Sequence, residues 1–411
     1  MNDARAIAEQ TARASYGKLL AWLCSRTSDV AGAEDALADA FRAALEHWPD
    51  NGVPHAPEAW ILTTARRKLI DQSRKNKTRA DAASTLLLAA EEAQDALQNE
   101  VVFPDERLKL MLACAHPAID ASIHTPLMLQ TVLGLDAARI ASAFLISPKA
   151  MSARLVRAKR KIKAANIPFA EPSIDTLPLR INALLEAIYA AYGTGWNDDD
   201  GADENSRGLT FEAIFLAKLV SDLSPDAAEA WGLLSLMLHA EARRAARRRD
   251  GIYVPLREQD TNLWDKQLIQ KAERALSHAW RLNQPGRYQI EAAIQSAHAA
   301  SKLSGRDVSD DIIVLYQRLI EIAPSIGAQV SYAAALSSGG QHDEALLVLD
   351  SIAANLIDSY QPYWAIRAHV LNALNRHAGA QSAYDRAIGL ASDPAVRTFL
   401  FEKKQMVGKA S

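Results

Sequence analysis

Two runs of arginine and lysine are the residues of this chain best suited to a chemical role, and that role is contact with a phosphate backbone. The first run lies between residues 66 and 79, where seven basic side chains are opposed only by Asp71. The second lies between residues 149 and 163 and contains no acidic residue. Basic side chains bind nucleic-acid phosphates with an affinity that falls steeply as salt rises. An ordinary solvated surface helix can carry a similar run, so the elements around each run must distinguish the two.

The first run belongs to a predicted helix that starts at Pro57. Ile61, Ala65 and Leu69 recur every four residues and are expected to face a core. The remaining face is polar and mostly basic, which suits contact with a nucleic-acid strand. It consists of Thr64, Arg67, Lys68, Asp71 and Lys75.

The second run has the pattern of a helix-turn-helix. Asp136 is a plausible N-cap of a short helix, an apolar turn follows at residues 144–146, and Ser147 and Pro148 suit the N-cap and first position of the next helix. A recognition helix places its first turns against base edges in the major groove. We therefore expect residues 149–154 to contact bases, although a plain helical hairpin with a charged face stays an alternative.

The spacing within this second helix separates an inward from an outward face. The apolar residues predicted to pack inward are Met151, Leu155, Ala158 and Ile162. The outward residues predicted to contact DNA are Lys149, Ser152, Ala153, Arg154, Arg157 and Lys161. Lys159, Arg160 and Lys163 are expected to add to the positive field.

The elements that carry these runs predict an all-α protein of several domains. Hydrophobic residues make up 49% of the 411 residues, and helix formers dominate long stretches without Gly or Pro. We expect two small helical domains at residues 1–80 and 104–170, the second a helix-turn-helix, joined by a linker at 81–103. A third helical domain is expected over residues 175–411.

The third domain contains an internal repeat. Residues 336–345 and 371–380 match at an offset of 35, with His342 and His377 in register and an apolar helix after each. This period is typical of tetratricopeptide-like helical hairpins.

Composition argues against several other classes of protein. The net charge of -3 would disfavour nucleic acid if it were evenly spread, but the basic runs are local. Cys24 and Cys114 cannot build a disulfide framework or a four-cysteine zinc site. No stretch is apolar enough for a membrane span, and no familiar catalytic motif occurs. We expect a cytoplasmic protein that is not an enzyme and uses no cofactor or metal.

Three further sequence features could be taken for binding sites, but a structural role explains each of them better. The acidic run at residues 193–208 departs from the calcium-loop pattern and is expected to be a solvated loop. The arginine cluster at 243–249 ends a helix, where cations meet the helix dipole favourably. Cys114 and His116 offer too few ligands for a metal, and a buried helix end explains them.

Taken in order, these segments resemble the extracytoplasmic-function (group IV) bacterial RNA polymerase sigma factors. Residues 33–49 look like part of region 2, and the resemblance implies that Asp35, Asp39 and Phe41 bind the clamp helices of the largest polymerase subunit. Residues 57–75 look like the part that melts DNA and contacts the minus-ten element. The residues implied there are Trp60, Thr64, Arg67, Lys68, Asp71, Arg74 and Lys75.

Residues 135–163 resemble region 4 of the same family. The resemblance implies binding to the minus-thirty-five element and to the flap of the second-largest polymerase subunit. Later segments, such as residues 228–247 and 256–269, resemble the subgroup that carries a tetratricopeptide-like C-terminal extension. Arg67, Arg139 and Ala153 depart from residues common in the family, and Ala38 stands where Gln is usual, so the bases contacted are left unassigned.

The sequence therefore predicts an alternative sigma factor that joins core RNA polymerase and promoter DNA. Its C-terminal domain is expected to regulate activity and to bind a regulatory protein or ligand. The alternative is a helix-turn-helix regulator, or a helical-repeat scaffold, that never joins polymerase.

Overall fold

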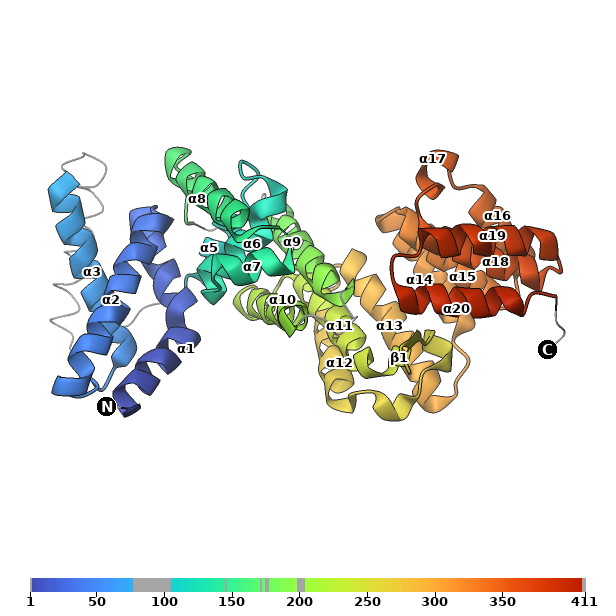
Figure 1. The fold of residues 1–411 in the computed structure, drawn as a ribbon, viewed down its shortest axis with the longest axis horizontal. Coiled ribbons are helices and arrows are strands. Elements are labelled where there is room, and N and C mark those ends of the chain that lie inside the picture. Colours follow the sequence, from blue (N-terminus) through green and yellow to red (C-terminus); the bar gives the residue numbers. More distant parts are fainter. Residues whose placement is uncertain are drawn as a thin grey trace. The chain divides into compact units, whose positions relative to one another are not determined.

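The chain is helical almost throughout, as its composition predicted (Figure 1). The computed structural model describes residues 2–76, 105–144, 146–170, 172–173, 177–197 and 204–408, so the expected linker at 81–103 lies outside the described residues. Strand structure in these ranges is limited to an antiparallel ribbon, β1 (Arg248–Arg249) with β2 (Ile252–Tyr253). The contacts divide the chain into two compact units, Met1–Pro225 and Asp226–Ser411.

The N-terminal unit begins with three helices, α1 (Asn2–Thr27), α2 (Val30–Asn51) and α3 (Pro57–Asn76). The Asp29 side chain caps α2 by accepting the backbone N–H of Gly32, at 3.1 Å. The helix continues through Pro49 and stops at Gly52, which has a φ of 83°. The breakers at residues 49–57 therefore end α2 slightly later than the sequence indicated.

Four shorter helices follow in the same unit: α5 (Arg107–Cys114), α6 (Ala121–Leu133), α7 (Ala137–Ala143) and α8 (Pro148–Ala164). The start of α8 is as predicted, since the Ser147 hydroxyl accepts the backbone N–H of Ala150 at 3.2 Å and Pro148 occupies the first turn. The C-cap of α6 is Gly134, which is in the left-handed conformation. These caps fix where α6 ends and where α8 begins.

Two long helices complete the N-terminal unit, α9 (Leu177–Asn197) and α10 (Glu204–Leu223). They pack on each other and on α5–α7. The Thr125 hydroxyl of α6 donates to the carbonyl of Ala187 at 2.6 Å, and Arg139 of α7 pairs with Glu212 at 3.2 Å. The boundary between the units therefore falls at Pro225, well after Pro172, and the finer division into 1–80, 104–170 and 175–411 stays a prediction.

The C-terminal unit is a succession of antiparallel helical hairpins. Its first elements are α11 (Ala228–Ala242), η1 (Arg244–Ala246), η2 (Leu256–Glu258), η3 (Thr261–Leu263), α12 (Lys266–Arg281), α13 (Arg287–Ser304) and α14 (Ser309–Ile322). They are followed by α15 (Ile326–Ser338), α16 (His342–Asp350), α17 (Ala354–Ile357), α18 (Gln361–Ala373), α19 (His377–Leu390) and α20 (Pro394–Gln405).

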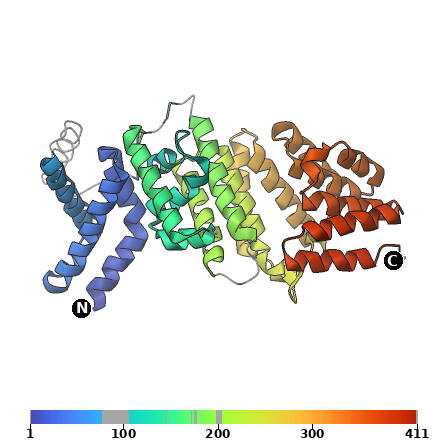
Figure 2. The same cartoon turned by 45° about the horizontal axis from the view of Figure 1, so that its top comes forward.

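The two segments that match at an offset of 35 residues lie in two helix pairs, α15–α16 and α18–α19 (Figure 2). His342 and His377 each begin the second helix of their hairpin. Equivalent positions of the two hairpins are buried in one core, namely Ala333 with Ala368, Leu336 with Leu371, and Ala345 with Ala380. Small alanine side chains at these helix contacts let the backbones approach closely.

Candidate polymerase and nucleic-acid interface

The exposed face of α3 carries the residues that the sequence predicted there. Ile61, Ala65 and Leu69 are buried, as their spacing required. Arg67, Lys68 and Asp71 are exposed, and Thr64 is half-buried with its hydroxyl donating to the carbonyl of Trp60 at 2.9 Å. Arg74 and Lys75 lie in the last turn of α3, where the structure describes the backbone only.

Trp60 lies at the edge of this face rather than fully within the core. Its ring is half-buried and meets the ring of Trp48 edge-on, with centroids 5.6 Å apart. Such an edge-to-face pair stabilises the contact between α2 and α3 and fixes the orientation of both rings. Packing between these helices therefore accounts for part of the Trp60 ring, and the rest of the side chain is partly exposed.

Arg66 does not contribute to the basic surface, contrary to the count of charges in the first run. Its side chain is only 2% exposed, and its guanidinium stacks over the ring of Trp22 at 4.2 Å. Position 66 lies four residues after Leu62 and three before Leu69, which are both buried, so it continues the core stripe of α3. That spacing is compatible with burial, but the ring of Trp22 that covers Arg66 belongs to α1, and no pattern within α3 reveals it.

The exposed side of α2 combines acidic and apolar residues. Asp35 is exposed, whereas Asp39 forms ion pairs with Arg42 and, at 4.0 Å, with Lys68 of α3. Phe41 is half-buried.

An apolar edge lies beside these carboxylates on α2. Ala38, Phe41 and Leu45 follow helical spacing of three and four residues, and Leu45 is 46% exposed. Sequence reasoning missed Leu45, although it lies four residues after Phe41. A mixed acidic and apolar surface of this kind suits a protein partner better than DNA.

The outward face of α8 also agrees with the spacing. Met151, Leu155, Ala158 and Ile162 are buried. The six residues predicted to contact DNA are all exposed: Lys149, Ser152, Ala153, Arg154, Arg157 and Lys161.

A groove beside α8 brings three of these cations together. It has a volume of about 350 Å³ and lies between the start of α6 and α8, where Arg154, Arg157 and Lys161 form one wall. Asp120 lies on the opposite side and caps α6 through the backbone N–H of Ser122, at 2.8 Å. The hydrogen bond from Ser122 and the charge of Arg154 lower the pKa of Asp120. Cations predominate in this groove, as contact with phosphates requires.

Two cations of the second run are neutralised by carboxylates, the first of them inside the fold and the second at the surface, which corrects the prediction that they add to the positive field. Lys159 is buried and forms an ion pair with Glu34 of α2. Lys163 pairs with Asp29, the N-cap of α2, at 2.6 Å. Both pairs join α8 to α2 across more than a hundred residues of sequence.

In the described part of the chain, only one of the two Glu34 carboxylate oxygens has a hydrogen-bond partner in this arrangement. Its Oε2 accepts a hydrogen bond from Lys159, whereas its Oε1 is buried without a hydrogen-bond partner among the described residues. Burial raises the pKa of Glu34, and Lys159 opposes that rise. The pair is therefore a buried charged contact that depends on Lys159.

Comparison with known proteins identifies the N-terminal part. Residues 12–79, which include α2 and α3, match the family described as sigma-70 region 2. The N-terminal part of the chain is therefore a sigma-70 region 2 domain. Residues 180–280 match a family of unknown function, DUF6596.

An uncharacterized protein of Rhizobium meliloti (strain 1021) is 33% identical to this chain over 373 residues, covering 90% of this chain and 88% of the relative. No solved structure matches the chain.

The other residues that the sequence singled out form contacts within the protein wherever the structure describes them. In the arginine cluster at residues 243–249, Arg244 pairs with Glu241 at 2.9 Å and Arg248 pairs with Asp393 at 2.9 Å. Cys114 is buried against the hydroxyl of Thr131, and most of the acidic run at 193–208 lies outside the described residues. Within the described ranges, no cluster of three or more potential ligands could hold a metal ion, and no helix is long and apolar enough to cross a membrane.

Proposed function

We propose that this protein is an alternative sigma factor of the extracytoplasmic-function type, which binds core RNA polymerase and directs promoter recognition and initiation. The observation that carries the proposal is the region 2 match over residues 12–79. That segment combines the acidic and apolar edge of α2 with the basic exposed face of α3. A protein surface and a nucleic-acid surface on adjacent helices are what a polymerase subunit that binds melted DNA requires.

The two surfaces of region 2 are assigned different partners. Asp35, Asp39 and Phe41, with Leu45 beside them, contact the clamp helices of the largest subunit. The α3 face contacts the melted minus-ten strand through exposed cations and half-exposed aromatic surface. Its residues are Trp60, Thr64, Arg67, Lys68, Asp71, Arg74 and Lys75.

The α7–α8 segment is proposed as the helix-turn-helix of region 4. The groove beside α8 holds Arg154, Arg157 and Lys161, which would contact phosphates, while Lys149, Ser152 and Ala153 lie near the start of the helix, where a recognition helix contacts bases. In this assignment the segment binds the minus-thirty-five element and the flap of the second-largest subunit.

The C-terminal unit is proposed as a tetratricopeptide-like regulatory extension. Its support is the pair of hairpins that repeat at 35 residues. Stacked hairpins present extended surfaces suited to a regulatory protein or ligand. We propose cytoplasmic action and assign the protein no enzymatic reaction.

Reconstitution with purified core polymerase tests the proposal. We expect the full chain to co-purify with the core enzyme and to start transcription at discrete sites, which transcript mapping after overexpression would locate. Leu45→Asp should weaken association with the core enzyme, because it places a charge in the apolar edge of α2. Operator binding without any association with polymerase would contradict the proposal and favour a helix-turn-helix regulator.

A second set of variants separates DNA contact from polymerase contact. Arg154→Ala and Arg157→Ala should each weaken promoter binding and reduce its salt dependence by about one counterion, while leaving core association intact. Arg318→Ala, on α14 of the C-terminal unit, serves as the charge-matched control. Equal losses for the control and the α8 variants would mean that the DNA surface is misassigned.

A further inference from the structure

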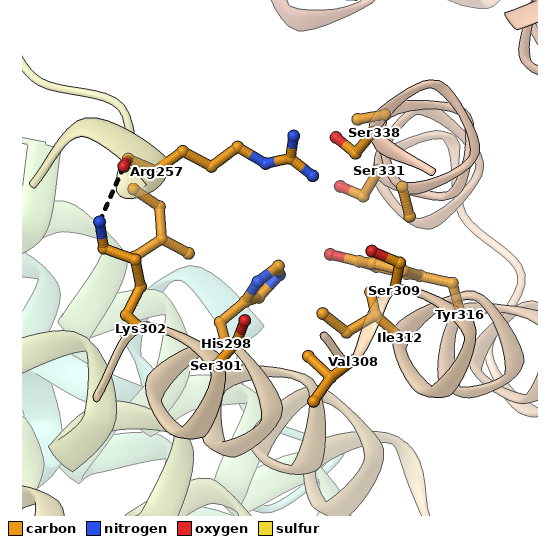
Figure 3. A pocket seen from close by; sticks show the side chains of 13 residues that line it. Arg257, His298, Ser301, Lys302, Val308, Ser309, Ile312, Tyr316, Ser331 and Ser338 are labelled. Atoms are coloured by element: carbon orange, nitrogen blue, oxygen red, sulfur yellow. Dashed lines mark hydrogen bonds between the residues drawn. The ribbon is translucent and has the colours of Figure 1, made fainter. Parts of the chain in front are cut away.

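A cavity of about 210 Å³ lies inside the C-terminal unit, between η2, α13, α14 and α15 (Figure 3). It is larger than the roughly 150 Å³ that encloses a benzene ring and smaller than the pockets of about 300 Å³ or more that hold drug-sized ligands. A ligand of a few heavy atoms would fit it. Neither the DNA-contacting surface nor the polymerase-contacting surface includes any of its residues.

The lining of this cavity is positively charged and rich in hydroxyl groups. Arg257 and Lys302 supply two cations, and Ser309, Ser331 and Ser338 supply hydroxyls. No aspartate or glutamate lines the cavity in the described part of the chain. Donors without a lining carboxylate favour an anionic ligand over a cationic one.

Arg257 is held so that its charged end lies over the cavity. The Lys302 ammonium donates to the backbone carbonyl of Arg257 at 2.8 Å, which ties η2 to α13. The Arg257 side chain then extends toward Ser331 and Ser338 on α15 (Figure 3). Among the described residues no carboxylate forms an ion pair with its guanidinium. Asp307, next to the lining residue Val308, is within range of its charge, since hydrogen bonds from Ser309 and, to a smaller extent, the charge of Arg257 lower the pKa of Asp307.

His298 lies on the α13 wall, and its pKa responds to the positive charges around the cavity. Burial, together with the charges of Arg243 and Arg257, lowers the pKa of His298 to about 4. The ring is therefore uncharged near neutral pH and can offer either a donor or an acceptor nitrogen. The Tyr316 hydroxyl points into the same space (Figure 3). Burial raises the pKa of Tyr316, and Ser331 opposes that rise.

We propose that this cavity binds a small oxyanion, the carboxylate or phosphate group of a metabolite. In this site Arg257 and the hydroxyls of Ser331 and Ser338 hold the anionic oxygens. The short remainder of the ligand lies on Val308 and Ile312, the apolar part of the lining. The site lies wholly in the C-terminal unit, so a ligand bound there acts directly on that unit.

Calorimetric titration of the full chain in a chloride buffer tests this site, with inorganic phosphate in one arm and butyrate in the other. We expect saturable binding of at least one probe below about 10 mM. Arg257→Gln should weaken that binding about tenfold or more, because a charge-assisted hydrogen bond is lost. The matched control is Arg318→Gln, which removes the same charge from α14 outside the cavity and should leave affinity unchanged.

The His298 ring gives a second, local readout by NMR. A bound oxyanion should raise the pKa of His298, because it offsets the field of Arg257, and only the probe that binds in calorimetry should do so. Phosphate binding alone would assign a phosphate ester, and butyrate binding alone a carboxylate. No saturable binding by either probe, or equal loss in both arginine variants, would overturn the proposal. These measurements need no polymerase, so their failure is distinct from failure of the proposed sigma activity.

Discussion

Replacing Lys159 by methionine should destabilise the N-terminal unit strongly, because it leaves the Glu34 carboxylate buried without its cation. The two side chains are 8% and 17% exposed, and Glu34 Oε1 has no hydrogen-bond partner in the described residues. Removing one partner of a buried ion pair costs about 3–5 kcal/mol. Since Glu34 keeps some contact with water, we expect about 3 kcal/mol, or a fall in Tm of roughly 6–12 °C for a unit of this size.

The double variant Lys159→Met with Glu34→Gln isolates the cause of this loss. A neutral, well-packed replacement of a buried pair is often no less stable than the pair itself. The double variant should therefore lie within about 1 kcal/mol of the wild type, so the two substitutions should couple strongly. Differential scanning calorimetry measures the stability, and hydrogen exchange of α2 and α8 shows where it is lost. A double variant as unstable as Lys159→Met alone would refute this explanation.

The loss should also depend on pH in a definite direction. The folded-state pKa of Glu34 is raised by burial, so its protonated form favours the folded state. That stabilisation is fully present below the unfolded pKa and is lost as pH rises through the folded pKa. Without Lys159 the pKa rises further, so the variant should lose more stability at about pH 8 than at about pH 5. A pH-independent loss would point to packing instead.

Three other predictions concern single positions. A Cβ at Gly17 would lie 2.0 Å from the carbonyl oxygen of Val132, so Gly17→Ala should lower stability by about 1–3 kcal/mol in thermal melts; Gly193→Ala, with nothing described within 4 Å, should not. The thiols of Cys24 and Cys114 have pKa values raised by burial, so thiol reagents should label them only as fast as the unit opens, and rapid native labelling would contradict this. The pKa of His298 is lowered to about 4, so it stabilises the fold above its unfolded pKa of about 6.5 and that contribution is lost toward pH 4; His298→Gln should flatten this acid dependence of the melting curve, and an unchanged slope would exclude it.

Helical periodicity predicted correctly which apolar side chains of α3 and α8 are buried. On α3 and α8 the apolar residues spaced by three and four are buried, and the predicted face residues with described side chains are exposed except Thr64, which is half-buried. The helix cap at Ser147 and the 35-residue spacing of the two helix pairs could also be predicted from the sequence, because both depend on short-range sequence patterns. The proposal that Asp35, Asp39 and Phe41 bind polymerase came from the family resemblance rather than from any local pattern.

The sequence by itself determined the helical class, the inward faces of α3 and α8, and the repeat of the C-terminal hairpins, since each follows from local spacing. Only the tertiary structure decided which charged side chains are exposed to solvent. Arg66 and Lys159 border the buried stripes of their helices, and distant partners, Trp22 and Glu34, cover them. It also decided that Arg257, Ser331 and Ser338 share one cavity. Burial and ion pairing depend on which elements come together in space, and no period within one helix encodes that.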